Sequence, residues 1–209
     1  LDKDWLRLII NEFDNHATEQ AILLKERYGG EVTVIAPEAE GVEDMLFTIA
    51  AKGADHVIKL AGDFEEEVNN HALARVFAET AKAYQPDLIL TGVQANDDLD
   101  GPVGPLVAEY LGMPYVGYIS GVTVEDRKAI VRKEYPGGLI AEMEVALPAV
   151  LGIQAGEKPP RYVAISKVRQ MMKTTEIEEQ EVLELDLSGG PTVSRMYLPE
   201  AAERAEMIE

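Results

Sequence analysis

The stretch LILTGVQANDDLDGPVGPLVAEYLGMP, residues 88–114, decides the fold class. Its apolar run stops at Gly92, an acidic loop follows, and an apolar-periodic segment begins after Gly101 and Pro102. This order predicts a strand, a loop and a helix. In open α/β sheets, ligands bind at the carboxyl ends of strands, and the first N–H groups of the next helix favour an anion. The stretch therefore predicts an anion-binding corner, or else an ordinary helix start preceded by acidic turn residues.

The segments around this stretch alternate between helical and extended patterns. The predicted helices lie at 14–28, 43–53 and 69–85, with Asp14 as the first N-cap, and the predicted strands lie at 31–36, 56–60 and 87–92. Such alternation implies an α/β fold with a doubly wound, mostly parallel sheet. After Pro114, period-two runs separated by turns at 125–127 and 136–138 predict an appended antiparallel β-meander, which ends in an apolar strand after Pro148.

Composition excludes several classes of function. The chain has 209 residues, 46% of them hydrophobic, which suits one large domain with an arm. Its net charge of −19 repels nucleic acids and anionic membranes. Cysteine is absent, so thiolate metal sites and thiol chemistry are excluded. The apolar runs are too short to span a membrane, so we expect no membrane insertion and a cytoplasmic protein.

The regular pattern thins after Gly156. A loop, a short helical stretch at 165–172 and an acidic tail follow. The tail carries apolar residues that a free arm would expose, so we expect it to lie on a partner subunit; they are Val193, Met196, Tyr197 and Leu198. The expected division is an α/β nucleotide-binding domain with its β-meander at 1–155, and a recognition loop with a C-terminal arm at 156–209.

Four motifs in order carry a family resemblance. The segment 91–114 resembles the nucleotide-binding loop of the β subunit of electron transfer flavoproteins. The segments INEFDNHATEQAILLKERYGGEVTVIAP (10–37), AAKGADHVIKL (50–60) and VRKEYPGGLIAEMEVALPAVLGIQAGEKPPRY (131–162) resemble further parts of that family. The resemblance implies a Rossmann-like fold and a heterodimer with an α subunit. Such a heterodimer carries electrons from flavin-dependent dehydrogenases, such as acyl-CoA dehydrogenases, to a quinone reductase or another acceptor. It is an electron carrier without a catalytic residue or metal of its own.

The resemblance also implies which cofactors and residues to expect. FAD is held chiefly by the α subunit, and this subunit holds AMP or a second FAD. The implied cofactor-binding residues are Asn11, Phe13, Asp14, Ala36, Gly92, Gln94, Ala95, Asp98, Gly101, Val103 and Gly104. We expect Gly104→Val to remove the nucleotide while the fold stays intact. Glu12, Val93 and the Gly101-Pro102 pair depart from the family pattern, which removes a basic side chain and two polar ones from the anion site.

A basic segment at 158–173 is the implied recognition loop for a dehydrogenase. The implied partner-recognition residues are Arg161, Tyr162, Ile165, Lys167 and Arg169, with Ile165 in the family's leucine position. The alternative is a solvated basic helix that packs Ile165, Val168 and Met172 on the chain's own core.

Two further expectations concern the chain start and the competing functions. Members of the family open with a central strand, so we expect a segment upstream of Leu1. The alternative function is a non-redox sensor or regulatory domain that binds an adenine nucleotide. A hydrolase acting on an adenine nucleotide is a weaker option, because no base or lysine stands near the loop.

Overall fold

In the computed structural model, the described residues are 9–64, 68–96, 100–192, 194, 195 and 197. Asp98 of the expected cofactor site lies outside them, as do Val193, Met196 and Leu198 of the expected arm. The helices are α1 (Glu12–Tyr28), α2 (Val42–Lys52), α3 (Asn70–Tyr84), α4 (Val103–Leu111) and α5 (Ile165–Thr174). The strands are β1 (Thr33–Pro37), β2 (His56–Ala61), β3 (Leu88–Gly92), β4 (Tyr115–Glu125), β5 (Lys128–Tyr135), β6 (Leu139–Ala146), β7 (Ala149–Ile153) and β8 (Glu178–Glu181).

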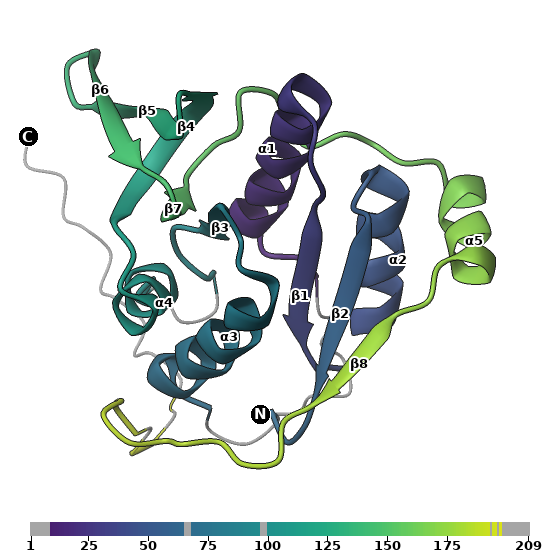
Figure 1. The fold of residues 1–209 in the computed structure, drawn as a ribbon. Coiled ribbons are helices and arrows are strands. Elements are labelled where there is room, and N and C mark those ends of the chain that lie inside the picture. The colour runs from purple at the N-terminus through teal and green to yellow at the C-terminus, as the bar shows by residue number, and fades with distance from the viewer. Residues whose placement is uncertain (1–8, 65–67, 97–99, 193, 196, 198–209) are drawn as a thin grey trace, which may run out of the picture.

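The strands form two sheets (Figure 1). One sheet has three parallel strands in the order β1-β2-β8, and the other has five strands in the order β3-β7-β4-β5-β6. In the second sheet β7 pairs in parallel with β3 and β4, whereas β4, β5 and β6 form an antiparallel meander. The α/β fold with mostly parallel pairing at its centre and an appended meander is therefore confirmed. Among the described residues, β1 is an edge strand of the three-stranded sheet and β3 is an edge strand of the five-stranded sheet.

Helix α1 starts earlier than the sequence pattern predicts. It begins at Glu12 with Asn11 as the N-cap residue, so the prediction of Asp14 as the cap is wrong. The Asp14 carboxylate instead accepts a hydrogen bond from outside the helix, from the N–H of Gly92. At the other end, Gly29 with φ of 81° closes the helix, because glycine adopts positive φ without strain.

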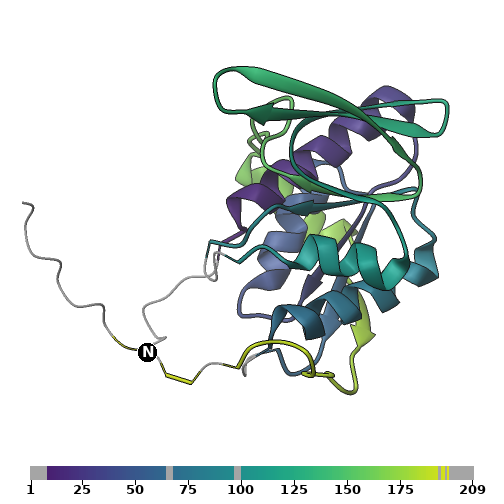
Figure 2. The same cartoon turned by 90° about the vertical axis from the view of Figure 1, so that its left-hand side faces the viewer.

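Apolar side chains fill the space between α1 and the five-stranded sheet. Figure 2 shows the meander at the top of the molecule with α1 beneath it. Ala17 of α1 packs there against buried residues of β4 and β7, including Ile119 and Leu151. A second cluster joins α2 to β1 and β2, and a third joins α3 and α4 to β7. Helix α1 is thus fixed over the sheet that ends in β3.

The first part of the acidic tail contacts this chain itself. The sequence pattern does not predict β8, which pairs in parallel with β2 from Ile58↔Glu178 onward. Beyond it, Arg75 of α3 donates to the carbonyl oxygens of Asp186 at 2.7 Å and Ser188 at 2.9 Å. Packing of the rest of the arm on a partner subunit stays a prediction. None of the helices in the described residues is long and apolar enough to cross a membrane.

Candidate functional site

The start of α1 and the end of β3 are joined by side-chain hydrogen bonds. The Asn11 amide Nδ2 donates to the carbonyl oxygen of Gln94 at 2.8 Å and to Asp14 Oδ2 at 2.7 Å. The Gly92 N–H donates to Asp14 Oδ1 at 2.7 Å. The structure thereby brings together Asn11, Asp14, Gly92 and Gln94, four of the expected cofactor-binding residues, at the carboxyl end of a parallel strand. This is where α/β folds bind ligands.

Gly92 is required for this junction. A Cβ at this position would lie 2.8 Å from Phe13 Cβ and 2.9 Å from the Asp14 backbone nitrogen. Real Cβ atoms do not approach other atoms so closely, so a side chain here would push α1 away. Gly92, one of the implied cofactor-binding residues, therefore serves the approach of α1 to β3. Phe13 is half-buried beside it.

The loop after β3 leads into an uncapped helix. Gly101 has φ of 72°, and α4 begins after Pro102 without a side-chain hydrogen bond to its first turn. Pro105 has no N–H, so Val103 and Gly104 supply the first donors of the helix. Free N–H groups and the helix dipole favour negative charge at this end.

Gly104 has a packing role that the sequence does not reveal. It is buried, and a Cβ there would lie 2.7 Å from Thr91 Oγ1 and 3.0 Å from Tyr115 Cε2. The expectation that Gly104→Val leaves the fold intact is therefore wrong, because the larger side chain collides with the interior. That variant cannot separate loss of a ligand from loss of packing.

The remaining expected cofactor residues lie around the same corner. Ala36 of β1 packs against the α2 cluster, and so does Ile10, the residue before Asn11. Val103 packs against the cluster of α3, α4 and β7, and Ala95 is half-buried in the loop. Ala36 and Val103 contribute packing contacts, so the expected role of these positions is to line the site.

Two cavities lie away from this corner. The larger, about 530 Å³, lies between α3 and the segment after β8, where Arg75, Tyr110 and Asp186 line it. The smaller, about 240 Å³, lies beside Lys59 and Glu43. Neither cavity is lined by an expected cofactor residue.

The chemistry of the corner fits an adenine nucleotide. The Asn11 Oδ1 atom is buried without a hydrogen-bond partner, which leaves an acceptor of the kind that binds an exocyclic amino group. The uncapped start of α4 offers N–H groups to phosphate oxygens. The Asp14 carboxylate, which would repel phosphate, is neutralised in part by the two N–H groups that it accepts.

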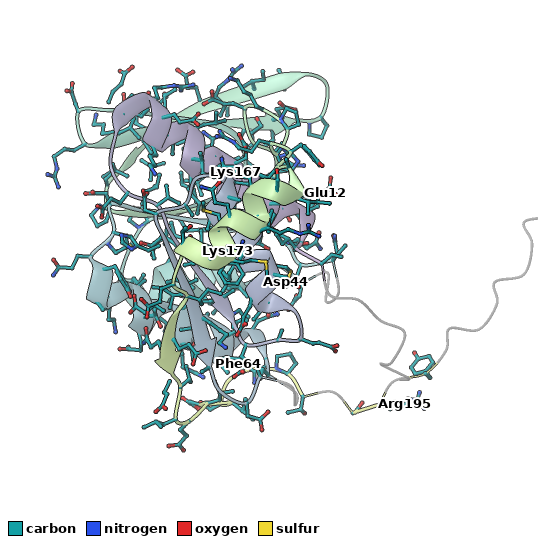
Figure 3. The ribbon with its side chains drawn as sticks, turned by 90° about the vertical axis from the view of Figure 1, so that its right-hand side faces the viewer. Glu12, Asp44, Phe64, Lys167, Lys173 and Arg195 are labelled. Atoms are coloured by element: carbon teal, nitrogen blue, oxygen red, sulfur yellow. The ribbon has the colours of Figure 1, made fainter. Side chains whose placement is uncertain are left out.

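Most of the expected partner-recognition residues face solvent. Tyr162 is 86% exposed and Ile165 is 67% exposed. Lys167 and Arg169 are also exposed on α5, and Figure 3 shows this helix from its outer side with Lys167 and Lys173 labelled. No residue of α5 is buried, so the alternative of Ile165, Val168 and Met172 packed on the chain's own core is wrong. The helix rests on the α2 cluster through Met171 instead.

Arg161 differs from the other expected recognition residues because its guanidinium is bound within the chain. Its Nη2 donates to Glu19 Oε1 at 2.9 Å and its Nη1 to Glu26 Oε1 at 2.6 Å. These hydrogen bonds, to Glu26 and then to Glu19, raise the pKa of Arg161 above its usual value. Nearby, burial lowers the pKa of Lys52, whose Nζ donates to Asn15 Oδ1.

Sequence reasoning missed the buried polar residues of α1. Glu19 is 2% exposed and Gln20 is 1% exposed, although the apolar residues at helical spacing in this segment are Ala17, Ala21, Leu24 and Tyr28. Glu19 lies two positions from Ala17, nearly on the opposite side of the helix, so the apolar spacing carries no signal for its burial. A buried carboxylate requires a partner, and Arg161 supplies it.

The histidines have structural partners. His16 Nδ1 accepts the N–H of Gly156 at 3.1 Å, and His71 Nδ1 lies 3.1 Å from the Tyr110 hydroxyl. Within the part of the chain that the structure describes, no group of three or more His, Cys, Asp or Glu side chains is placed to hold a metal ion.

Comparison with known proteins assigns the family. Residues 6–185 match the family model described as the electron transfer flavoprotein domain. The chain is 33% identical to the electron transfer flavoprotein subunit beta of Methylophilus methylotrophus, over 100% of this chain and 83% of that protein. It is 37% identical to the subunit of the same name from Syntrophomonas wolfei, over 80% of this chain and 66% of that protein. It is 32% identical to the caffeyl-CoA reductase-Etf complex subunit CarD of Acetobacterium woodii, over 96% and 79%. The chain belongs to the electron transfer flavoprotein family.

Proposed function

We propose that this chain is the β subunit of a heterodimeric electron transfer flavoprotein and that it holds an adenine nucleotide where α1 meets β3. Its relatives named subunit beta support the assignment, and so does the uncapped start of α4 beside that junction. The observation that carries the nucleotide site is the buried, unpartnered Asn11 Oδ1 atom beside the hydrogen bond that joins Asn11 to Gln94.

Different residues of the corner suit different parts of the nucleotide. Asn11 and Gln94 lie at the end suited to adenine, whereas the N–H groups of Val103 and Gly104 suit phosphate. Gly92 and Asp14 hold the two chain segments together. FAD supplies redox chemistry when it is bound, whereas AMP supplies structure alone. The side chains of this chain bind and orient the nucleotide. Electrons are transferred by the cofactors of the heterodimer.

The exposed segment around Tyr162 and Ile165 is the proposed contact for a flavin-dependent dehydrogenase. The large apolar side chains of Tyr162 and Ile165 are exposed to solvent there, and the basic residues Lys167 and Arg169 lie close by in the sequence. A partner with an apolar pocket and an acidic rim would bury the first pair and attract the second. The competing function, a non-redox nucleotide sensor, uses the same corner and leaves this exposed pair without a role.

The nucleotide site is tested by its content. The chain is purified with its co-expressed α subunit, the complex is denatured, and released nucleotides are quantified by chromatography and mass spectrometry. We expect Asn11→Ala and Gln94→Ala to lower the nucleotide of this subunit at least fivefold, while Gln170→Ala, an exposed glutamine on α5, leaves it unchanged. Full nucleotide content in both site variants would rule out this corner as the site.

A further inference from the structure

One side of α1 holds the backbone of the segment 156–161. The His16 ring accepts the N–H of Gly156 at 3.1 Å, and Gln20 Oε1 accepts the N–H of Glu157 at 3.0 Å. Glu19 Oε2 accepts the N–H of Arg161 at 3.0 Å. The positions 16, 19 and 20 share one helical face, so they form a continuous row of acceptors. Figure 1 shows the segment after β7 crossing α1 before it reaches α5.

Arg161 is the last point of attachment before the exposed residues. Besides its backbone bond, its Nε and Nη2 donate to Glu19 Oε1 at 3.0 and 2.9 Å. The Glu19 side chain is only 3% exposed, whereas that of Arg161 is 29% exposed. A backbone bond and a forked guanidinium contact to one buried carboxylate fix both the place and the direction of this residue.

Two exposed apolar residues follow Arg161, Tyr162 directly and Ile165 at the start of α5. Tyr162 is 86% exposed and Ile165 is 67% exposed, so packing on this chain holds neither in place. Pro159 and Pro160 restrict the backbone just before Arg161. The orientation in which Tyr162 leaves the surface therefore depends on the attachment of Arg161 to Glu19. That of Ile165, the first residue of α5, depends on the same attachment together with the packing of Met171 on the α2 cluster.

A buried ion pair is an expensive way to gain stability alone. Burial of the Glu19 carboxylate carries a desolvation cost, and apolar pairs of similar volume often stabilise a fold as well or better. What the ion pair adds is a defined geometry. We propose that Glu19 and Arg161 are positioning residues, which hold Tyr162 and Ile165 in one orientation for docking of a protein partner. The partner's identity as a dehydrogenase rests on the proposed function; the positioning itself does not.

The test uses distances between spin labels in the full chain, which contains no cysteine of its own. Labels are attached at Ser166→Cys, beside Ile165, and at Glu142→Cys on β6; both residues are exposed. Double electron–electron resonance then gives the distribution of distances between the labels. We expect one narrow distribution, which Arg161→Ala broadens at least twofold. Arg169→Ala is the matched control for loss of an arginine, and Ile22→Val is the control for a weakened core; both should keep the narrow distribution.

A distribution in Arg161→Ala as narrow as in the unsubstituted chain would overturn the proposal, and so would a broad distribution in the unsubstituted chain. If Arg161→Ala does not fold, Glu19→Gln and Arg161→Lys, which keep side-chain size but lose the charged fork contact, decide in the same way.

A kinetic measurement adds the docking readout. A purified acyl-CoA dehydrogenase with its acyl-CoA substrate reduces the heterodimer, and we expect Arg161→Ala to raise KM for the heterodimer about tenfold with kcat unchanged. A lower kcat with unchanged KM would contradict positioning. If the unsubstituted heterodimer is not reduced at all, the choice of dehydrogenase in the proposed function fails, and the label distances alone decide the positioning.

Discussion

Gly92 and Asp14, 78 residues apart in the chain, are joined by a 2.7 Å hydrogen bond from the backbone N–H to the carboxylate. The bond ties the first turn of α1 to the last residue of β3. It requires a residue without a side chain at position 92, because α1 occupies the space where a Cβ would stand. The candidate nucleotide site is built on this contact.

Gly92→Ala tests the contact. The added methyl group would lie 2.8 Å from Phe13 Cβ, so α1 must shift, and we expect a loss of about 1–3 kcal/mol in the free energy of unfolding. Urea denaturation measures it. Gly121→Ala is the control, since the nearest atom to its Cβ, Arg132 Cδ, is at 3.5 Å. Equal stability of the two variants would show that α1 does not approach β3 so closely.

Arg161→Ala leaves the buried Glu19 carboxylate without its guanidinium partner. Because an uncompensated buried charge is costly, we expect the free energy of unfolding to fall by on the order of 3 kcal/mol. Arg169→Ala, an exposed arginine on α5, should change it by less than about 0.5 kcal/mol. Chemical denaturation of both variants provides the comparison, and a similar small effect in both would contradict the ion pair.

Glu157 gives the fold an acid-sensitive contact. The hydrogen bond from Arg27, with Nη2 at 2.7 Å from Glu157 Oε2, holds the pKa of Glu157 below its usual 4.5. A carboxyl with a lowered pKa in the folded state contributes stability above its unfolded pKa, and this contribution is lost as the pH falls through the folded value.

Arg27→Met removes that contribution. The stability difference between the unsubstituted chain and this variant should therefore be full at neutral pH and shrink as the pH falls below about 4.5. Denaturation curves across a pH series measure the difference. A difference that stays constant with pH would mean that Arg27 does not act through the Glu157 carboxylate.

The alternating helices and strands were predictable because their signals are local. Pro86 and the glycine pairs mark the ends of segments, and the period-two runs after Pro114 identify the meander. The strand β8 was not predictable in this way. Its sequence, Glu-Glu-Gln-Glu at 178–181, has no strand pattern, and it is extended because β2 offers a parallel neighbour.

The candidate site was predictable in its place but not in its contacts. The strand–loop–helix corner is readable at 88–114, yet the role of Gly92 depends on Phe13 and Asp14, which lie far away in the chain. The same holds for Glu19, which is buried only because Arg161 arrives 142 residues later to bind it. Local periodicity cannot report a partner at such a separation.

Ile165→Ser tests the exposed segment. Because Ile165 is 67% exposed, we expect the free energy of unfolding to change by less than about 0.5 kcal/mol. If Ile165 enters a pocket on a dehydrogenase, the same variant should raise KM for electron transfer at least tenfold. Leu183→Ser, at a residue 92% exposed on the segment after β8, is the control and should leave KM unchanged. Equal KM values for the two variants would remove Ile165 from the docking surface.

The nucleotide content of the purified complex tests the proposed function most directly. The chain is co-expressed with its α subunit, and the two are isolated together, denatured and analysed by mass spectrometry. We predict one FAD with one AMP per heterodimer, or two FAD if this subunit itself holds a redox flavin. A colourless chain that binds no α subunit and releases no adenine nucleotide would contradict it.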